Sequence, residues 1–176
     1  MALRKLRVQP DVVLRLKARR VPAIDRGIHR LIDDMIETMI DASGVGLAAP
    51  QVGISLRVVV IQLPEDAQAT ILINPEMVRR VGERELTEGC LSVPGFCGDI
   101  KRAESVTVKA QDLQGRPFRI KAKGLLAEVL EHELDHLNGV LYVDHLEKPE
   151  DLHKLEPEEQ APTEGGVATA PGQAAT

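Results

Sequence analysis

Residues 124–139 read GLLAEVLEHELDHLNG, and this stretch decides the predicted fold and chemistry. Its leucines recur at three- and four-residue steps, which is the spacing of the apolar face of an amphipathic helix. These leucines are Leu126, Leu130, Leu134 and Leu137. Gly139 can take the left-handed conformation that closes a helix, so we expect the helix to begin after Gly124 and to end at Asn138.

Two histidines of this helix, His132 and His136, are four residues apart and therefore project from one face, where both imidazoles can reach one metal ion. On a helical projection Glu133 lies beside the leucines, whereas Glu131 and Asp135 point away from them. Burying an ionised carboxylate without a partner is costly, so an inward Glu133 indicates a group that moves protons. The pattern predicts a metal-dependent hydrolase of an amide-type bond.

A catalytic metal needs a third protein ligand, for which the sequence offers three positions. Tyr142 stands where the extended motif HExxHxxGxxH requires a histidine, which excludes that class of metallopeptidase. Glu156 has the spacing of a downstream glutamate ligand, but it lies among Pro and Glu residues. Cys90, in the sequence EGCLS, is the remaining candidate, and a thiolate with two imidazoles suits zinc, iron, cobalt or nickel.

The segment Gly44–Gln51, GVGLAAPQ, also requires an explanation. Its small, uncharged residues allow the backbone of a ligand to come close, and its main chain could pair with an extended peptide as an added strand. It lacks the Gly-Lys-Ser/Thr ending of a phosphate-binding loop. Without the other motifs it would be read as a turn.

The rest of the chain predicts a single α+β domain with antiparallel sheets around the histidine helix. A first helix begins at Asp25 and ends at Ser43-Gly44, and a short helix follows Pro10-Asp11. Alternating branched and polar residues indicate strands, the last two joined by a hairpin turn at 112–115. These strands are Leu56–Gln62, Thr70–Asn74, Ser105–Ala110 and Pro117–Ala122.

Composition limits the partners of the protein. The chain has 176 residues and a net charge of −5, without the basic face of a nucleic-acid-binding domain, and no apolar run is long enough to span a membrane. Residues 1–155 form the predicted catalytic domain, and residues 156–176 a disordered acidic tail after a weak helix over Pro149–Gln160. Cys90 and Cys97 are expected to be free thiols or metal ligands, since the chain reads as cytosolic.

Taken together, the three motifs GVGLAAPQ, EGCLS and EHELDHLNG resemble those of the peptide deformylases, in the same order and from about Val8 to Leu146. This resemblance implies removal of the formyl group from the N-terminal formylmethionine of newly made bacterial proteins. It also implies metal ligation by Cys90, His132 and His136, with Glu133 as general base and then acid. The metal expected from the resemblance is Fe²⁺, with Zn²⁺, Ni²⁺ or Co²⁺ as alternatives.

The resemblance also implies the groups that hold the substrate. The side-chain amide of Gln51 and the backbone N–H of Leu91 would stabilise the oxyanion. The implied substrate contacts are Gly44, Val45, Gly46, Leu86, Glu88, Gly89, Leu125 and Val129. Glu128 falls near the methionine pocket where family members often carry an apolar residue, and Glu131 replaces the usual Gln. We further predict an ion pair between Asp135 and Arg102 that orients the metal helix.

Three hypotheses remain at this point. The first is a deformylase, monomeric and cytoplasmic, acting on nascent polypeptides and associating with the ribosome. The second is a metallopeptidase or other amide hydrolase with the same HExxH site, against which Gly44–Gln51 argues. The third is a metal-binding protein without catalysis, which would lack a base or an oxyanion donor, whereas Glu133 and Gln51 are both present.

Overall fold

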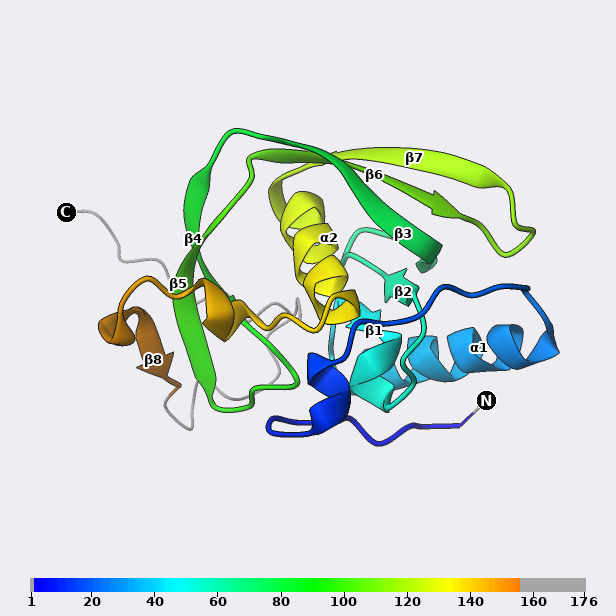
Figure 1. Cartoon of the computed structure of the whole chain (residues 1–176), viewed down its shortest axis with the longest axis horizontal. Coiled ribbons are helices and arrows are strands. Elements are labelled where there is room, and N and C mark those ends of the chain that lie inside the picture. The colour runs from blue at the N-terminus through cyan, green and yellow to red at the C-terminus, as the bar shows by residue number, and fades with distance from the viewer. Residues whose placement is uncertain (1, 156–176) are drawn as a thin grey trace.

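The computed structural model describes residues 2–155, in which two helices pack against two antiparallel sheets (Figure 1). The helices are α1 (Arg26–Asp41) and α2 (Gly124–Leu137). The larger sheet has the order β1-β2-β3-β6-β7, with β1 (Gly46–Ala48), β2 (Val58–Ile61), β3 (Thr70–Val81), β6 (Ser105–Gln111) and β7 (Pro117–Lys123). The smaller sheet has the order β4-β5-β8, with β4 (Arg84–Gly89), β5 (Phe96–Arg102) and β8 (Leu152–Lys154). This confirms the α+β prediction.

Residues 2–155 also contain four short 3₁₀ helices: Val12–Arg15, Ala49–Val52, Tyr142–His145 and Pro149–Asp151. The helix predicted over Pro149–Gln160 is present only as the 3₁₀ helix Pro149–Asp151 and is wrong at residues 152–154, which form β8 and pair with β5. The remainder of that helix, Glu156 and the predicted tail 156–176 lie outside the described residues.

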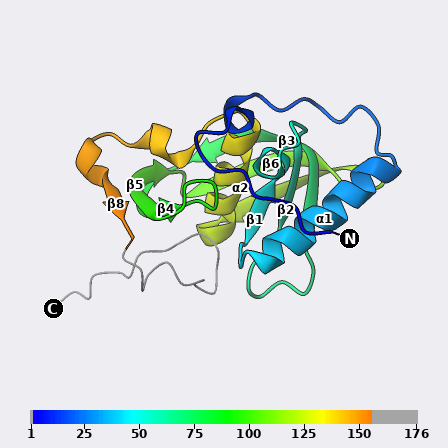
Figure 2. The ribbon, with the colours of Figure 1, turned by 90° about the horizontal axis from the view of Figure 1, so that it is seen from below.

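The large sheet lies between the two helices. Strand β2 is apolar at every position because each of its faces packs against one of them. Val58 and Val60 belong to one cluster with Met35 and Met39 of α1, together with other residues on that face. Val59 and Ile61 belong to a second cluster with α2, which includes Leu130, Leu134 and Leu137. Because successive side chains of a strand point to opposite faces, β1 and β2 are buried between α1 and α2 (Figure 2).

The predicted start of α1 and the predicted end of α2 are confirmed. Asp25 caps α1 by accepting a hydrogen bond from the Ile28 amide at 3.0 Å, and Asn138 ends α2 directly before Gly139, whose φ is +74°. A Cβ at Gly139 would lie 2.5 Å from the carbonyl oxygen of Arg15, so this position needs glycine twice over. The N-terminal segment thus packs against the end of the helix that carries the histidines.

The strand prediction was incomplete. Strands β2, β3, β6 and β7 lie where they were expected, although β3 continues to Val81. Strands β4 and β5, with the sequences RELTEG and FCGDIKR, were not predicted because charged residues interrupt their alternation. They pair in register over their whole length, from Arg84 opposite Arg102 to Gly89 opposite Cys97, which brings the end of β4 beside α2.

Candidate active site

One sulfur and two imidazole nitrogens converge between the end of β4 and the middle of α2. Cys90 directly follows β4, and its Sγ lies 3.2 Å from Nε2 of His136. Nε2 of His136 lies 3.2 Å from Nε2 of His132, and the three ligand atoms are all within 4.8 Å of one another. The structure therefore brings together the three residues predicted as metal ligands, from motifs more than forty positions apart.

The donor set fits a divalent metal ion. His132 binds Oε2 of Glu88 through Nδ1 at 2.9 Å, so the proton is assigned to Nδ1 and the lone pair of Nε2 faces His136 and Cys90. One sulfur and two imidazole nitrogens at this separation can donate lone pairs to a single cation between them. Soft thiolate with imidazole is a donor set that suits zinc or iron.

A buried chain of charged groups supports His132 from behind. Glu88 accepts from Nη2 of Arg102 at 2.7 Å as well as contacting His132, and Arg102 reaches Asp135 at 2.7 Å through Nη1. Asp135 in turn lies 2.7 Å from Nε2 of His145. The predicted ion pair between Arg102 and Asp135 is confirmed, and Glu88 extends it to His132, a candidate metal ligand.

Neighbouring groups favour the ionised forms of the Glu88 carboxyl and the Cys90 thiol. Burial would raise the pKa of Glu88, but the hydrogen bonds and charges of His132 and Arg102 outweigh it and lower that pKa to about 2. Burial likewise opposes ionisation of Cys90, yet His136 and His132 hold the pKa of its thiol well below the usual value. Cys90 is thus poised to bind as a thiolate.

Glu133 lies inward, as predicted, and is only 3% exposed. Burial raises the pKa of its carboxyl to about 7, which suits a group that takes up and releases a proton near neutral pH. Within residues 2–155 its Oε2 has no hydrogen-bond partner. A Cβ at Gly46 would lie 2.6 Å from Oε1 of Glu133, so a glycine here lets strand β1 run directly past the carboxylate.

Gln51 lies beside Cys90 in a fixed orientation. Its Oε1 accepts from the Ala48 amide at 2.8 Å, which turns the Nε2 group toward Sγ of Cys90, 3.9 Å away, and Oγ of Ser92, 3.5 Å away. Leu91 follows Cys90 in the chain, and its side chain approaches the position of Gly44. Both predicted oxyanion donors therefore lie next to the candidate metal ligands.

The predicted substrate contacts fall into two groups. Val45, Leu125 and Val129 pack together in the cluster beneath α2, and Gly44 and Gly46 flank Val45 at the start of β1. Leu86 and Cys90, next to Gly89 at the end of β4, pack instead against a third cluster, which consists of Leu14, Val93, Ile100, Leu141 and Tyr142. Strand β1 is the edge of its sheet, so one side of its backbone is not paired within the sheet.

Glu131 differs from the sequence-based picture, and Glu88 and Glu128 have partners inside the protein. The outward position of Glu131 was wrong: it is 4% exposed and accepts from the Ala103 amide and from Nε of Arg80, both at 2.8 Å. Glu88, predicted as a substrate contact, uses both carboxylate oxygens inside the protein. Glu128 is buried against Arg84 at 3.4 Å. The periodicity of the sequence does not show that these three carboxylates are buried, and their pairing with arginines follows from that burial.

Comparison with known proteins agrees with this geometry. The family model described as polypeptide deformylase matches residues 3–151. A peptide deformylase of Dehalococcoides mccartyi is 54% identical over 164 residues, covering 93% of this chain and 98% of that protein. A crystal structure of a peptide deformylase from Legionella pneumophila has a TM-score of 0.82 at 51% identity, covering 85% of this chain and 89% of the other. That of Synechococcus elongatus in complex with actinonin has a TM-score of 0.80 at 46% identity, covering 84% and 80%.

Proposed function

Because this chain belongs to the polypeptide deformylase family of metal-dependent hydrolases, we propose that it removes the formyl group from N-terminal formylmethionine of newly made proteins. The observation that carries this proposal is the convergence of Cys90, His132 and His136 beside the buried carboxylate of Glu133. In this proposal the reaction yields formate and a free amino terminus.

Cys90, His132 and His136 are the residues that would hold the metal, and Fe²⁺ is the ion we propose from the family resemblance. A divalent cation supplies a Lewis acid that polarises a carbonyl and makes water more acidic. The hydrogen bond from His132 to Glu88 supports this assignment, since metal-binding histidines commonly donate their second ring N–H to a carboxylate.

Glu133 is the proposed proton carrier. As a carboxylate it takes the proton from water that attacks the formyl carbon, and as a carboxylic acid it returns the proton to the departing amine. A pKa of about 7 makes both forms accessible at neutral pH. Its Oε2, which has no hydrogen-bond partner within residues 2–155, leaves a lone pair for that proton.

Gln51 and Leu91 are the proposed donors to the oxyanion that forms during attack. The Nε2 group of Gln51 is oriented by the bond from Ala48 to its Oε1, so it need not reorganise during the reaction. The backbone N–H of Leu91 is the second proposed donor. Removing one such donor typically costs about 2.7–4 kcal/mol of transition-state stabilisation.

The proposed peptide site follows the open edge of β1. An extended substrate adds to this edge by main-chain hydrogen bonds, passing Gly44 and Gly46 and reaching Gly89 at the end of β4. The methionine side chain enters the apolar space bounded by Leu86, Leu125, Val129 and Val45. Glu88 acts from behind His132 through its side chain and faces the substrate only with its backbone.

Formate release by the anaerobically purified protein from a formylmethionyl tripeptide tests this function. Glu133→Gln is expected to reduce the rate by about 10²–10⁴-fold while the bound metal, measured by elemental analysis, stays the same. Glu150→Gln, at an exposed position of the 3₁₀ helix Pro149–Asp151, removes the same charge and is expected to leave the rate unchanged. Loss of metal in Glu133→Gln contradicts a proton-carrying role.

Cys90→Ser tests the ligand set, because a serine hydroxyl is a much poorer ligand than a thiolate. We expect a large loss of metal affinity, and unchanged affinity would remove Cys90 from the set. Cleavage of internal peptide bonds without formate would favour the metallopeptidase alternative. The elemental analysis also distinguishes Fe²⁺ from Zn²⁺, Ni²⁺ and Co²⁺.

The proposed setting is the bacterial cytoplasm, with a monomer acting on nascent chains. Within residues 2–155 neither helix is of a length and apolarity that would cross a bilayer. Gel filtration tests the monomer, and cosedimentation with ribosomes tests the association that the family resemblance implies. The proposed domain limits, 1–155 for catalysis and 156–176 for the tail, are tested by assaying a chain that ends at Leu155.

A further inference from the structure

A second pocket, of about 390 Å³, lies on the side of α2 away from the metal ligands. Leu134 and Asn138 of α2 form part of its wall, whereas Cys90, His132, Glu133 and His136 do not. Four basic side chains line the pocket: Lys17, Arg20, Arg57 and Arg80. In a chain with a net charge of −5, such a concentration of positive charge in one pocket requires an explanation.

Arg57 is the buried member of this set, with 8% of its surface exposed. Its guanidinium donates to the carbonyl oxygens of Leu137 at 3.2 Å and Pro75 at 2.9 Å, and to Oδ1 of Asn138 at 3.1 Å. All three acceptors are neutral, and no ion pair to Arg57 is present within residues 2–155. Burial lowers the pKa of Arg57, so its charge lacks a close counter-ion in a poorly solvated place.

Glu76 is the one carboxylate that lines the pocket, and its charge is already matched twice. One oxygen binds Arg20 and the other binds Lys109 at 2.7 Å. Because both oxygens are engaged, Glu76 acts on Arg57 only through its charge and without a direct contact, so neither Arg57 nor Lys17 has an ion pair within residues 2–155.

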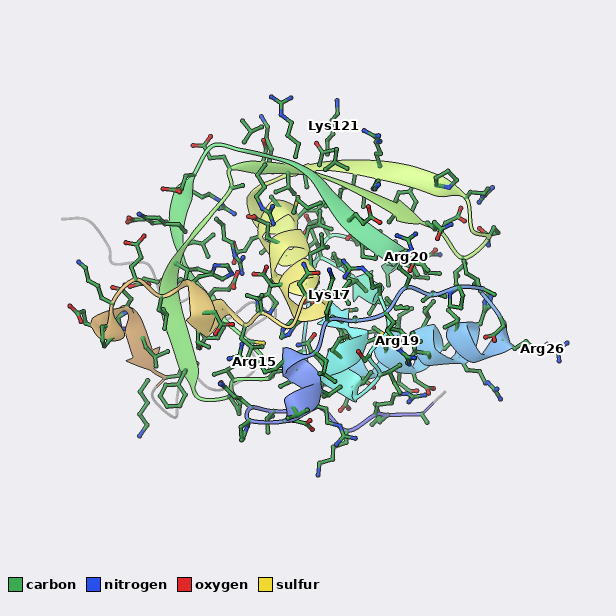
Figure 3. All side chains as sticks on the ribbon, in the orientation of Figure 1. Arg15, Lys17, Arg19, Arg20, Arg26 and Lys121 are labelled. Atoms are coloured by element: carbon green, nitrogen blue, oxygen red, sulfur yellow. The ribbon has the colours of Figure 1, made fainter. Side chains whose placement is uncertain are left out.

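Lys17 and Arg80 are available to a ligand. Lys17 is exposed and has no ion pair in the described part of the chain. Arg80 binds Glu131 through Nε, while 54% of its side chain remains exposed. Figure 3 shows Lys17 and Arg20 on the segment that crosses the end of α2 toward β3, with Arg15 and Arg19 on the same segment. Positive groups therefore surround the pocket from three parts of the chain.

We propose that this pocket binds the phosphate group of a phosphomonoester or phosphodiester, held by Lys17, Arg57 and Arg80. Guanidinium groups match the oxygens of phosphate in pairs, and an ammonium group adds a point charge. A phosphomonoester carries up to two negative charges, and neighbouring phosphodiester groups of a polymer carry one each, which suits a surplus of more than one positive charge better than a single carboxylate does. This inference goes beyond the proposed hydrolysis and does not depend on it.

Calorimetric titration of the metal-loaded protein with inorganic phosphate, at constant ionic strength, tests the proposal. Lys17→Gln is expected to weaken phosphate binding by about ten-fold, the loss of one charge-assisted hydrogen bond. Lys17→Arg keeps the charge and is expected to restore most of the affinity. Acetate, titrated in the same way, is expected to bind more weakly than phosphate.

Lys121→Gln is the matched control. Lys121 is an exposed lysine on β7, and Figure 3 shows it far from the segment that carries Lys17. The two substitutions change the net charge equally, and neither residue belongs to the proposed catalytic machinery, so formate release should be unchanged in both. Equal phosphate affinity of Lys17→Gln and Lys121→Gln would overturn the proposal. Any phosphate that still bound would then be assigned to the metal centre or to non-specific attraction by the protein's charges.

A ten-nucleotide single-stranded RNA, titrated by fluorescence anisotropy, distinguishes the two sources of phosphate. Tighter binding than inorganic phosphate, falling steeply with salt and weakened by Lys17→Gln, identifies a phosphodiester polymer that also contacts Arg15 and Arg19. Binding no tighter than phosphate identifies a small phosphorylated ligand. Absence of binding by both phosphate and RNA would refute the site.

Discussion

Helices α1 and α2 are of similar length and both carry an apolar stripe, but they place their polar residues differently. In α1 the buried side chains form one face, and charged residues such as Arg30 and Asp33 are exposed on the other. In α2 ten of the fourteen residues are buried, and the polar ones among them lie on several sides of the helix. These polar residues are Glu128, Glu131, His132, Glu133 and His136.

Helix α2 tolerates buried charge because strands β3, β4 and β5 supply partners for it. Arg80 meets Glu131 at 2.8 Å, Arg84 meets Glu128 at 3.4 Å, and Arg102 meets Asp135 at 2.7 Å. Glu88 reverses the pattern by bringing a carboxylate to His132. Each pair ties one turn of the metal helix to a strand, so the same contacts that neutralise the charges also fix the orientation of the helix.

The comparison predicts that removing a buried partner near α2 is far more damaging than removing one near α1. Arg102→Met leaves the carboxylates of Glu88 and Asp135 without their cation, and breaking a buried pair in this way costs about 3–5 kcal/mol. We expect this loss in the free energy of unfolding, measured by urea denaturation. A fall of about 10–100-fold in metal affinity should accompany it, because Glu88 then holds His132 less firmly.

Arg4→Met is the matched control at α1. Arg4 pairs with Asp34 at 2.9 Å, but its side chain is one-third exposed, so the loss should stay below about 1 kcal/mol. Metal affinity should not change, since Arg4 contacts no residue of α2 among those described. Similar losses in the two variants would show that burial does not distinguish the helices.

A smaller difference is expected between two carboxylates of these helices. Glu131→Ala leaves the buried amide of Ala103 without an acceptor and Arg80 without its partner, which should cost about 1–3 kcal/mol. Asp33→Ala removes an exposed carboxylate from α1 and should change stability by less than about 0.5 kcal/mol. Thermal unfolding of both variants beside the parent protein measures the difference, and a cost near zero for Glu131→Ala would mean that water replaces the carboxylate.

The contrast also explains which parts of the fold the sequence predicts. Periodicity and branched residues find α1, α2, β2, β3, β6 and β7. Strands β6 and β7 alternate buried and more exposed positions, whereas β2 is buried throughout, and β1, three buried residues, was not among the predicted strands. Periodicity fails at β4 and β5, where residues such as Glu88 and Arg102 are buried with their charges paired across elements. A projection that equates the side of α2 away from the leucines with solvent therefore placed Glu131 outside, whereas α2 is buried on most sides.

The candidate site divides in the same way. His132 and Glu133 were identified from residue type and spacing, Cys90 was the remaining candidate for the third ligand, and Gln51 and Leu91 were implied by the family resemblance. The structure brings these residues together. That Glu88 supports His132 could not be read from spacing, because it depends on the register of β4 against β5 and on the rotation of α2. The sequence did offer one signal: Glu88 and Asp135 each lie within two residues of a candidate metal ligand, and a carboxylate buried there needs a cationic partner such as Arg102.

Capping provides a further contrast, since only α1 has a side-chain cap at its N-terminus. Asp25 accepts from the Ile28 amide at 3.0 Å, so Asp25→Ala should cost about 1 kcal/mol. Asp25→Asn, which keeps an oxygen acceptor, should cost much less. Urea denaturation measures both, and formate release should be unaffected because α1 carries none of the proposed catalytic residues.

The smallest expected effect is a gain at the start of α2, where the N-cap is Lys123 and makes no side-chain hydrogen bond. Its backbone is extended, with φ −136° and ψ 168°, which is the conformation that an N-cap serine adopts, and its side chain is exposed. Lys123→Ser should therefore satisfy an amide of the first turn and stabilise the protein by about 0.5 kcal/mol.

Lys121→Ser, two residues earlier on β7, changes the same charge without reaching the helix and should show no gain in urea denaturation. Nine residues of helix, roughly 13 Å, separate the cap from His132, so formate release should stay constant; a changed rate would mean that the start of α2 transmits its position to the metal ligands.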